Sequence, residues 1–152
     1  MTRILITGSN SGFGKLAALS LARQGHEVVA TMRNLAKGEE LRSVAASENL
    51  PIEIRSLDVC DPASVAAAIG DPNDLDVVVN NAGFEVAGAV ERVDDELLAR
   101  QFDTNVAGPL RVIRTVLPAW RLRGSGTVVN VSSIAGVVGT PFGGVYAASK
   151  HA

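Results

Sequence analysis

The sequence predicts an α/β fold in which helices cover both faces of a doubly wound parallel sheet. Short runs rich in valine and isoleucine alternate with segments of helical apolar spacing, the order that parallel strands joined by right-handed crossovers require. The run Val77–Val79 consists of three consecutive valines, which indicates a strand buried on both sides. The length of 152 residues, 47% of them hydrophobic, corresponds to one domain with a sizeable core.

Each predicted strand is short, apolar and bounded by turn residues, which gives the ranges Arg3–Thr7, Glu27–Thr31, Ile52–Leu57, Leu75–Asn80 and Thr127–Ser132. Apolar spacing predicts helices over Gly14–Gln24, Leu35–Glu48, Pro62–Ile69 and Asp94–Leu122. Asp61 and Asp94 are good helix N-caps. We expect Gly108-Pro109 and Pro118 to bend or divide the last helix.

Composition excludes several classes of protein. The net charge of -2 offers no electrostatic surface for nucleic acid or anionic lipid. Cys60 is the single cysteine, which rules out a disulfide framework and a cysteine zinc site. The apolar run at the N-terminus is too short for a signal peptide. The uncharged segment Gly124–Ser149 contains glycines and Pro141, so we expect no membrane span. A cytoplasmic, soluble protein is the expectation.

A glycine-rich loop follows the first strand and leads directly into the first helix. Such a loop lets backbone N–H groups approach a pyrophosphate, which the helix N-terminus also attracts. The alternative is a plain turn and cap. No Gly-Lys-Ser/Thr triplet is present, which disfavours a P-loop NTPase. The candidate cofactor-binding residues of this loop are Gly8, Asn10, Ser11, Gly12, Phe13 and Gly14.

The ends of the next three strands carry further candidates. Arg33 follows the second strand where NAD-binding folds often have a carboxylate, and its guanidinium could pair with a 2′-phosphate. This favours NADP over NAD, the alternative being a surface arginine. Asp58 and Val59 end the third strand, and Asp58 could bind adenine or only start a turn. Asn81, Ala82 and Gly83 follow the fourth strand and could line the cofactor or end the strand.

The last segment contains a candidate proton-transfer group. Tyr146 and Lys150 are four residues apart, so on a helix they share one face. A phenol transfers protons poorly at neutral pH unless its anion is stabilised, and a neighbouring ammonium does this. Ser133, after the fifth strand, could hydrogen-bond a substrate oxygen. The alternative is a Tyr–Lys pair on a solvated helix.

Together these motifs resemble the short-chain dehydrogenase/reductase family, in its shorter-chain alcohol and ketone oxidoreductase subgroup, and they span the whole chain. The matching motifs are Thr7-Gly8-x-x-x-Gly12-x-Gly14, Asn80-Asn81-Ala82-Gly83, Asn105, Ser133 and Tyr146-x-x-x-Lys150. The resemblance implies a Rossmann-like NAD(P)-binding domain over residues 1–152. Phe13 replaces the more common isoleucine or leucine and keeps its apolar character.

The resemblance also implies roles for individual residues. Tyr146 would be the general acid/base and Lys150 would hold the nicotinamide ribose and lower the tyrosine pKa. Ser133 would orient the substrate carbonyl, and it is preferred to Ser132 because it lies thirteen residues before the tyrosine. Asn105 would sit at a break in the long helix and hold a water next to Lys150.

The chain stops two residues after Lys150, whereas the family continues through this helix to further strands. We therefore expect the C-terminal part of the domain to be missing, with the fifth strand an open sheet edge and the apolar faces of the long helix without partners. For the complete enzyme the resemblance implies a homo-oligomer.

The predicted function is NAD(P)(H)-dependent interconversion of a secondary alcohol and a ketone or aldehyde, with NADP(H) preferred and NAD(H) possible. The Val, Phe, Gly and Ala content of segments 84–92 and 134–145 favours a small, fairly apolar substrate. The alternative from another class is a non-catalytic NADP-binding module or inactive fragment. A serine hydrolase using Ser133 and His151 is disfavoured, because no Gly-x-Ser-x-Gly elbow surrounds the serine.

Overall fold

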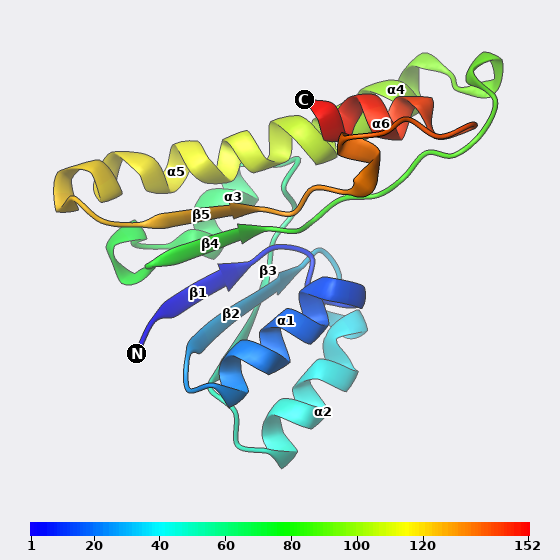
Figure 1. Cartoon of the computed structure of the whole chain (residues 1–152). Coiled ribbons are helices and arrows are strands. Elements are labelled where there is room, and N and C mark those ends of the chain that lie inside the picture. The colour runs from blue at the N-terminus through cyan, green and yellow to red at the C-terminus, as the bar shows by residue number, and fades with distance from the viewer.

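The computed structural model describes residues 1–152 and contains one sheet of five parallel strands. The strands lie in the order β3-β2-β1-β4-β5 (Figure 1). Their bounds are β1 Arg3–Ile6, β2 Glu27–Met32, β3 Ile52–Ser56, β4 Val77–Asn80 and β5 Thr127–Asn130. The predicted Rossmann-like doubly wound class is confirmed, and the strand order reverses direction between β1 and β4, where such sheets bind ligands.

Six α-helices accompany the sheet: α1 Gly12–Arg23, α2 Glu39–Ser47, α3 Pro62–Ile69, α4 Asp95–Phe102, α5 Gly108–Arg123 and α6 Gly144–His151. Both predicted caps are confirmed. The Asp61 carboxylate accepts a hydrogen bond from the N–H of Ala63 at the start of α3, and that of Asp94 from Leu97 at the start of α4.

Two apolar clusters hold the helices to the two faces of the sheet. Successive side chains of a strand point to opposite faces, so Leu5 joins one cluster while its neighbours Ile4 and Ile6 join the other. The Leu5 cluster includes Trp120 of α5, and the other packs α1 and α2 against the sheet. Both layers are visible in Figure 1.

The predicted long helix is divided, but at one place only. A π-helical turn, Asp103–Ala107, separates α4 from α5. Pro109 follows this turn and has no N–H to donate to the carbonyl of Asn105, which favours irregular backbone there. Contrary to the expectation, Pro118 does not divide the helix. α5 continues through this exposed proline, which removes only one helical hydrogen bond.

The strand β5 pairs with β4 alone and is largely exposed, so the expected open sheet edge is confirmed. The expectation that the apolar faces of the long helix lack partners is wrong for one face of α5, whereas Leu110 and Leu122 on the same helix are exposed as expected. Its residues Val112, Val116 and Trp120 are buried in the core. None of the helices combines the length and the hydrophobicity that a membrane-spanning segment needs.

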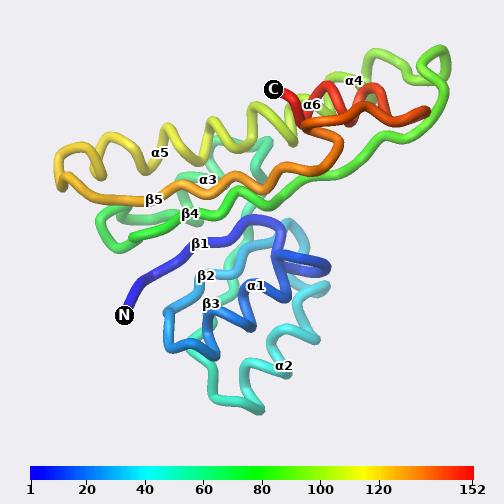
Figure 2. Tube along the Cα trace, viewed as in Figure 1, coloured from blue at the N-terminus to red at the C-terminus, as the bar shows by residue number.

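The carboxyl ends of the strands all face the same region of the molecule. Figure 2 shows the chain leaving β4 and β5 toward α4 and α6, which lie next to each other beyond that edge. Residues that directly follow the strands are thereby gathered at one place.

Candidate active site

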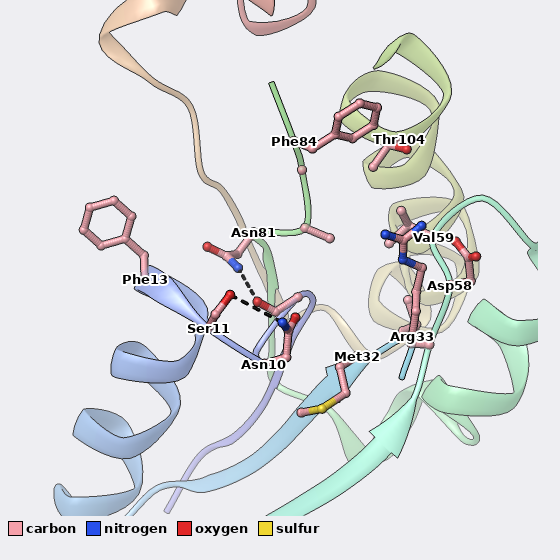
Figure 3. A pocket seen from close by; sticks show the side chains of 14 residues that line it. Asn10, Ser11, Phe13, Met32, Arg33, Asp58, Val59, Asn81, Phe84 and Thr104 are labelled. Atoms are coloured by element: carbon pink, nitrogen blue, oxygen red, sulfur yellow. Dashed lines mark hydrogen bonds between the residues drawn. The ribbon is translucent and has the colours of Figure 1, made fainter. Parts of the chain in front are cut away.

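A cleft of about 270 Å³ opens at the carboxyl edge of the sheet. It collects residues that follow four different strands, as Figure 3 shows. Ten of the predicted cofactor-binding residues line it: Gly8, Asn10, Ser11, Phe13, Arg33, Asp58, Val59, Asn81, Ala82 and Gly83. The sequence reasoning missed four others, which are Met32, Leu57, Phe84 and Thr104.

At two positions after β1, Gly8 and Gly14, the surrounding atoms leave no room for a side chain. Gly8 has a left-handed φ of 71°, and a Cβ added to it would lie 2.9 Å from the Cα of Ala82. A Cβ on Gly14 would collide with the Asn81 side chain and the Gly8 carbonyl. Gly12 also has a left-handed φ, 55°, at the start of α1. This packing brings the bare loop against the end of β4 and fits the close approach of a phosphate.

Side-chain hydrogen bonds fix this loop to the end of β4. The buried hydroxyl of Thr7 accepts from the backbone N–H groups of Asn81 and Ala82, at 3.0 and 2.9 Å. In return the Asn81 amide donates to the carbonyls of Thr7 and Gly8, at 2.9 and 3.0 Å. Asn81 therefore does both things that the sequence left open, since it ends the strand and lines the cleft.

Arg33 and Asp58 lie on the β2–β3 side of the cleft. Arg33 is exposed and makes no hydrogen bond or ion pair with the protein. Its side chain is one of those that line the cleft in Figure 3. A guanidinium in this position is available to an anion. The Asp58 carboxylate accepts a hydrogen bond from the N–H of Cys60 at 2.9 Å, so it starts the turn toward α3 and also lines the cleft.

A second hollow of about 200 Å³ lies between β5, α5 and α6, and Lys150 and Asn105 both line it. The Lys150 ammonium donates to the carbonyl of Val131 at 2.9 Å. Burial lowers the pKa of Lys150 below its usual range. The ammonium lies 5.9 Å from the centre of the Tyr146 ring, so the two predicted residues do share a helix face.

Asn105 occupies the π-helical turn and is buried. Its Oδ1 accepts from the N–H of Phe84 at 3.1 Å, and its Nδ2 donates to the Phe84 carbonyl at 2.9 Å and to the Ser149 hydroxyl at 3.0 Å. The predicted position of Asn105 at a helix break is confirmed. These contacts also connect α6 to Phe84 in the wall of the first cleft.

Gln101 is fully buried one turn before Asn105, and sequence reasoning missed it. Its amide donates to the Phe84 carbonyl at 2.5 Å and accepts from the N–H of Val86 at 2.6 Å. Gln101 and Asn105 together bond the segment Phe84–Val86 much as a neighbouring strand would. No sequence pattern marks this segment, because its partners are side chains of a helix.

Ser133 has a local hydrogen bond only. Its hydroxyl accepts from the N–H of Ala135 at 3.2 Å, and neither it nor the Tyr146 hydroxyl lines a described hollow. The neighbouring Ser132 hydroxyl is directed to the Lys150 carbonyl, at 3.5 Å. The serine hydrolase alternative lacks a general base for Ser133, because the His151 ring contacts the carbonyl of Ala147 instead.

Comparison with known proteins agrees with this arrangement. The family model described as short chain dehydrogenase matches residues 2–152. The uncharacterized oxidoreductase YusZ of Bacillus subtilis is 44% identical over 153 residues, which cover 97% of this chain and 54% of that protein. The 3-ketodihydrosphingosine reductase of Bacteroides thetaiotaomicron is 39% identical over 154 residues, covering 98% of this chain and 53% of that protein.

Among solved structures, a variant of actinorhodin polyketide ketoreductase with NADPH superposes with a TM-score of 0.89 at 33% identity. The match covers 99% of this chain and 60% of that one. The chain thus spans about half the length of the curated relatives it matches.

Proposed function

The chain belongs to the short-chain dehydrogenase family, and we propose that it supplies the nucleotide site and catalytic residues of an NADP(H)-dependent oxidoreductase. The reaction interconverts an alcohol and the corresponding carbonyl compound, a ketone for a secondary alcohol or an aldehyde for a primary one. The observation that carries this proposal is the position of the Lys150 ammonium, 5.9 Å from the Tyr146 ring. Both groups thereby face the same side of α6, where a phenol can exchange a proton with a substrate oxygen and an ammonium can bind the cofactor.

The cleft fits a dinucleotide cofactor. A pyrophosphate can approach the loop where Gly8 and Gly14 leave no space for a Cβ. The unpaired Arg33 supports a preference for NADP(H) over NAD(H), because its guanidinium could bind a 2′-phosphate. When bound, the nicotinamide would supply or accept the hydride. NADPH in the related ketoreductase structure agrees with this preference.

The residues of this chain then have distinct tasks. Tyr146 donates a proton to the carbonyl oxygen in reduction and accepts it in oxidation. Lys150 lies on the same face of α6 and would donate to ribose hydroxyls of the cofactor. Ser133 is the proposed donor to the substrate oxygen, and Asn105 holds α6 to the wall of the cleft through Ser149 and Phe84.

A small, fairly apolar carbonyl or alcohol is the proposed substrate. The segment between β5 and α6 exposes Ile134, Val137, Val138 and Phe142, and such side chains bind apolar surface in ligand sites. The name of the Bacteroides relative, 3-ketodihydrosphingosine reductase, also indicates the reduction of a ketone. A homo-oligomeric complete enzyme in the cytoplasm is part of the same proposal.

A non-catalytic NADP-binding module is the second candidate. The observation in its favour is that the Ser133 hydroxyl is engaged with Ala135 and has no contact with Tyr146. In that case the cleft would bind the nucleotide and no carbonyl would be reduced.

Fluorescence titration of the 152-residue chain with NADPH and with NADH tests the nucleotide site, and NADPH oxidation with simple ketones tests the chemistry. We expect saturable binding that is tighter for NADPH, together with turnover. Binding without turnover would favour the module, and binding of neither nucleotide would overturn the proposal for this chain.

A further inference from the structure

Arg111, on the first turn of α5, joins two segments that are distant in sequence. Its guanidinium donates to the carbonyl of Val59, which follows β3, at 3.1 Å. It also donates to the Asp103 carboxylate, at 2.5 Å, and to the Asp103 carbonyl, at 3.4 Å. The Arg111 side chain is only 24% exposed, so these bonds are partly shielded from water.

Both segments held by Arg111 contribute to the nucleotide cleft. Val59 lines the cleft, and so does Thr104, the residue that follows Asp103 in the π-helical turn (Figure 3). The turn and the end of β3 are also in contact at Cys60, whose thiol lies 3.3 Å from the Thr104 hydroxyl. Tight packing continues at Gly108, where a Cβ would lie 2.8 Å from the Val59 side chain.

We propose that Arg111 is a positioning residue for nucleotide binding, which fixes Val59 and Thr104 as the wall of the adenosine half of the cleft. This inference rests on the proposed function, because it takes the cleft to be the dinucleotide site. In the strand order β3-β2-β1-β4-β5, Val59 follows β3 and Arg33 follows the adjacent β2, whereas the glycine loop follows β1. Lys150 lies at the other side of the sheet, where it bonds Val131 after β5. The adenosine half is therefore the part that Arg111 holds.

Arginine suits this position because its planar fork carries several donors that diverge toward acceptors on two residues. A lysine has one ammonium on a flexible stem and cannot bond both residues with the same geometry. The pKa of Asp103 lies below its usual range, chiefly because of the hydrogen bond from Arg111, which agrees with a firm pairing. Because Val59 and Thr104 are fixed before the nucleotide binds, less conformational entropy is lost on association.

The test measures the affinity of the 152-residue chain for 2′,5′-ADP, which contains the adenosine half alone, and for NADPH, by titration calorimetry. The variants are Arg111→Met, which removes the donors, and Arg111→Lys, which keeps the charge. Arg114→Met is the control for charge on an exposed position of the same helix. Val116→Ala is the control for stability, because it removes a buried core side chain that does not line the cleft.

We expect Arg111→Met to weaken 2′,5′-ADP and NADPH by the same factor, about three- to tenfold, with Arg111→Lys also weaker than the wild type. Both controls should keep wild-type affinity at a temperature where all variants are folded. Unchanged 2′,5′-ADP affinity in Arg111→Met, or an equal loss in Val116→Ala, overturns the inference. If Arg111→Met does not fold, Arg111→Lys decides by the same comparison. A wild-type chain that binds neither compound overturns the proposed function instead, and this inference with it.

Discussion

The Thr7 hydroxyl, at the end of β1, accepts hydrogen bonds from the N–H of Asn81 at 3.0 Å and of Ala82 at 2.9 Å, at the end of β4. Thr7 is 1% exposed, so water cannot replace this oxygen. The Thr7 hydroxyl thus fixes the backbone at the end of β4, where the loop that lines the cleft begins.

Replacing Thr7 by valine should therefore destabilise the protein, since it leaves two partly buried N–H donors without their acceptor. We expect a loss of about 1–3 kcal/mol in the free energy of unfolding, measured by urea denaturation. Thr7→Ser keeps the oxygen and is the matched control, which should lose clearly less. Equal losses in the two variants would show that the methyl group, and not the hydroxyl, matters.

Arg33→Ala should weaken NADPH binding by about tenfold or more and leave NADH affinity nearly unchanged. The reason is that the proposed partner of the guanidinium is the 2′-phosphate, which NADH lacks. Parallel fluorescence titrations measure the ratio of the two affinities. Arg42, whose guanidinium pairs with Glu39 on α2, provides the control Arg42→Ala. A parallel loss for both nucleotides would contradict the phosphate role.

Tyr146→Phe should abolish turnover while NADPH affinity stays near the wild-type value. The variant lacks only the phenolic oxygen, and its hydroxyl makes no hydrogen bond within the protein, so the fold has little to lose. A rate reduction of about a hundredfold or more is expected for a lost general acid. Ketone-dependent NADPH oxidation gives the rate. A variant as active as the wild type would remove Tyr146 from the mechanism.

Gln101→Met should lower the free energy of unfolding by about 1–3 kcal/mol, because the N–H of Val86 then has no acceptor. The side-chain volumes are similar, so packing changes little. The exposed amide of Gln24, the residue after α1, bonds only Ser20 and gives the control Gln24→Met, for which we expect almost no change. A similar small change in both variants would mean that the buried amide adds nothing to stability.

The Arg111–Asp103 pair predicts a dependence of stability on pH. The pKa of Asp103 is lowered in the folded state by Arg111, so the pair stabilises the fold above the unfolded value of about 4. This contribution is lost as the pH falls through the folded-state pKa. The stability difference between the wild type and Arg111→Met should therefore shrink between neutral pH and about pH 3.

The expected pH effect on stability is small, because the Asp103 side chain is 40% exposed and solvent screens the pair. Denaturant unfolding at both pH values, with Arg114→Met in parallel, measures it, and a pH-independent difference would argue against the pair.

The sheet and the nucleotide cleft could be predicted from the sequence because parallel strands bring their carboxyl ends to one edge. Residues directly after the strands, such as Gly8, Arg33 and Asn81, therefore had to be neighbours, and all three line the cleft. The tyrosine and lysine followed from helical spacing, which puts residues four apart on one face.

Long-range side-chain contacts could not be predicted in this way. Gln101 looks like any polar residue of an amphipathic helix, and its partners lie in a segment without periodicity. The bond from Arg111 to Val59 spans 52 residues and depends on where α5 crosses the sheet. Pro118 does not end α5, because a proline on the exposed side of a helix can be accommodated with the loss of one backbone hydrogen bond.

The central place of β1 also bears on how the polypeptide is made. β1 pairs with β2 on one side and with β4 on the other, and the N–H of Arg3 bonds to Asp76, 73 residues later in the chain. At roughly 5–20 residues per second, a ribosome needs roughly 4–15 s to add that length. During this interval the apolar strand has one unpaired side in the nascent chain. We expect this interval to be when the protein depends most on chaperones, and substitutions that weaken β4 to reduce the yield of native protein more than those in the exposed β5.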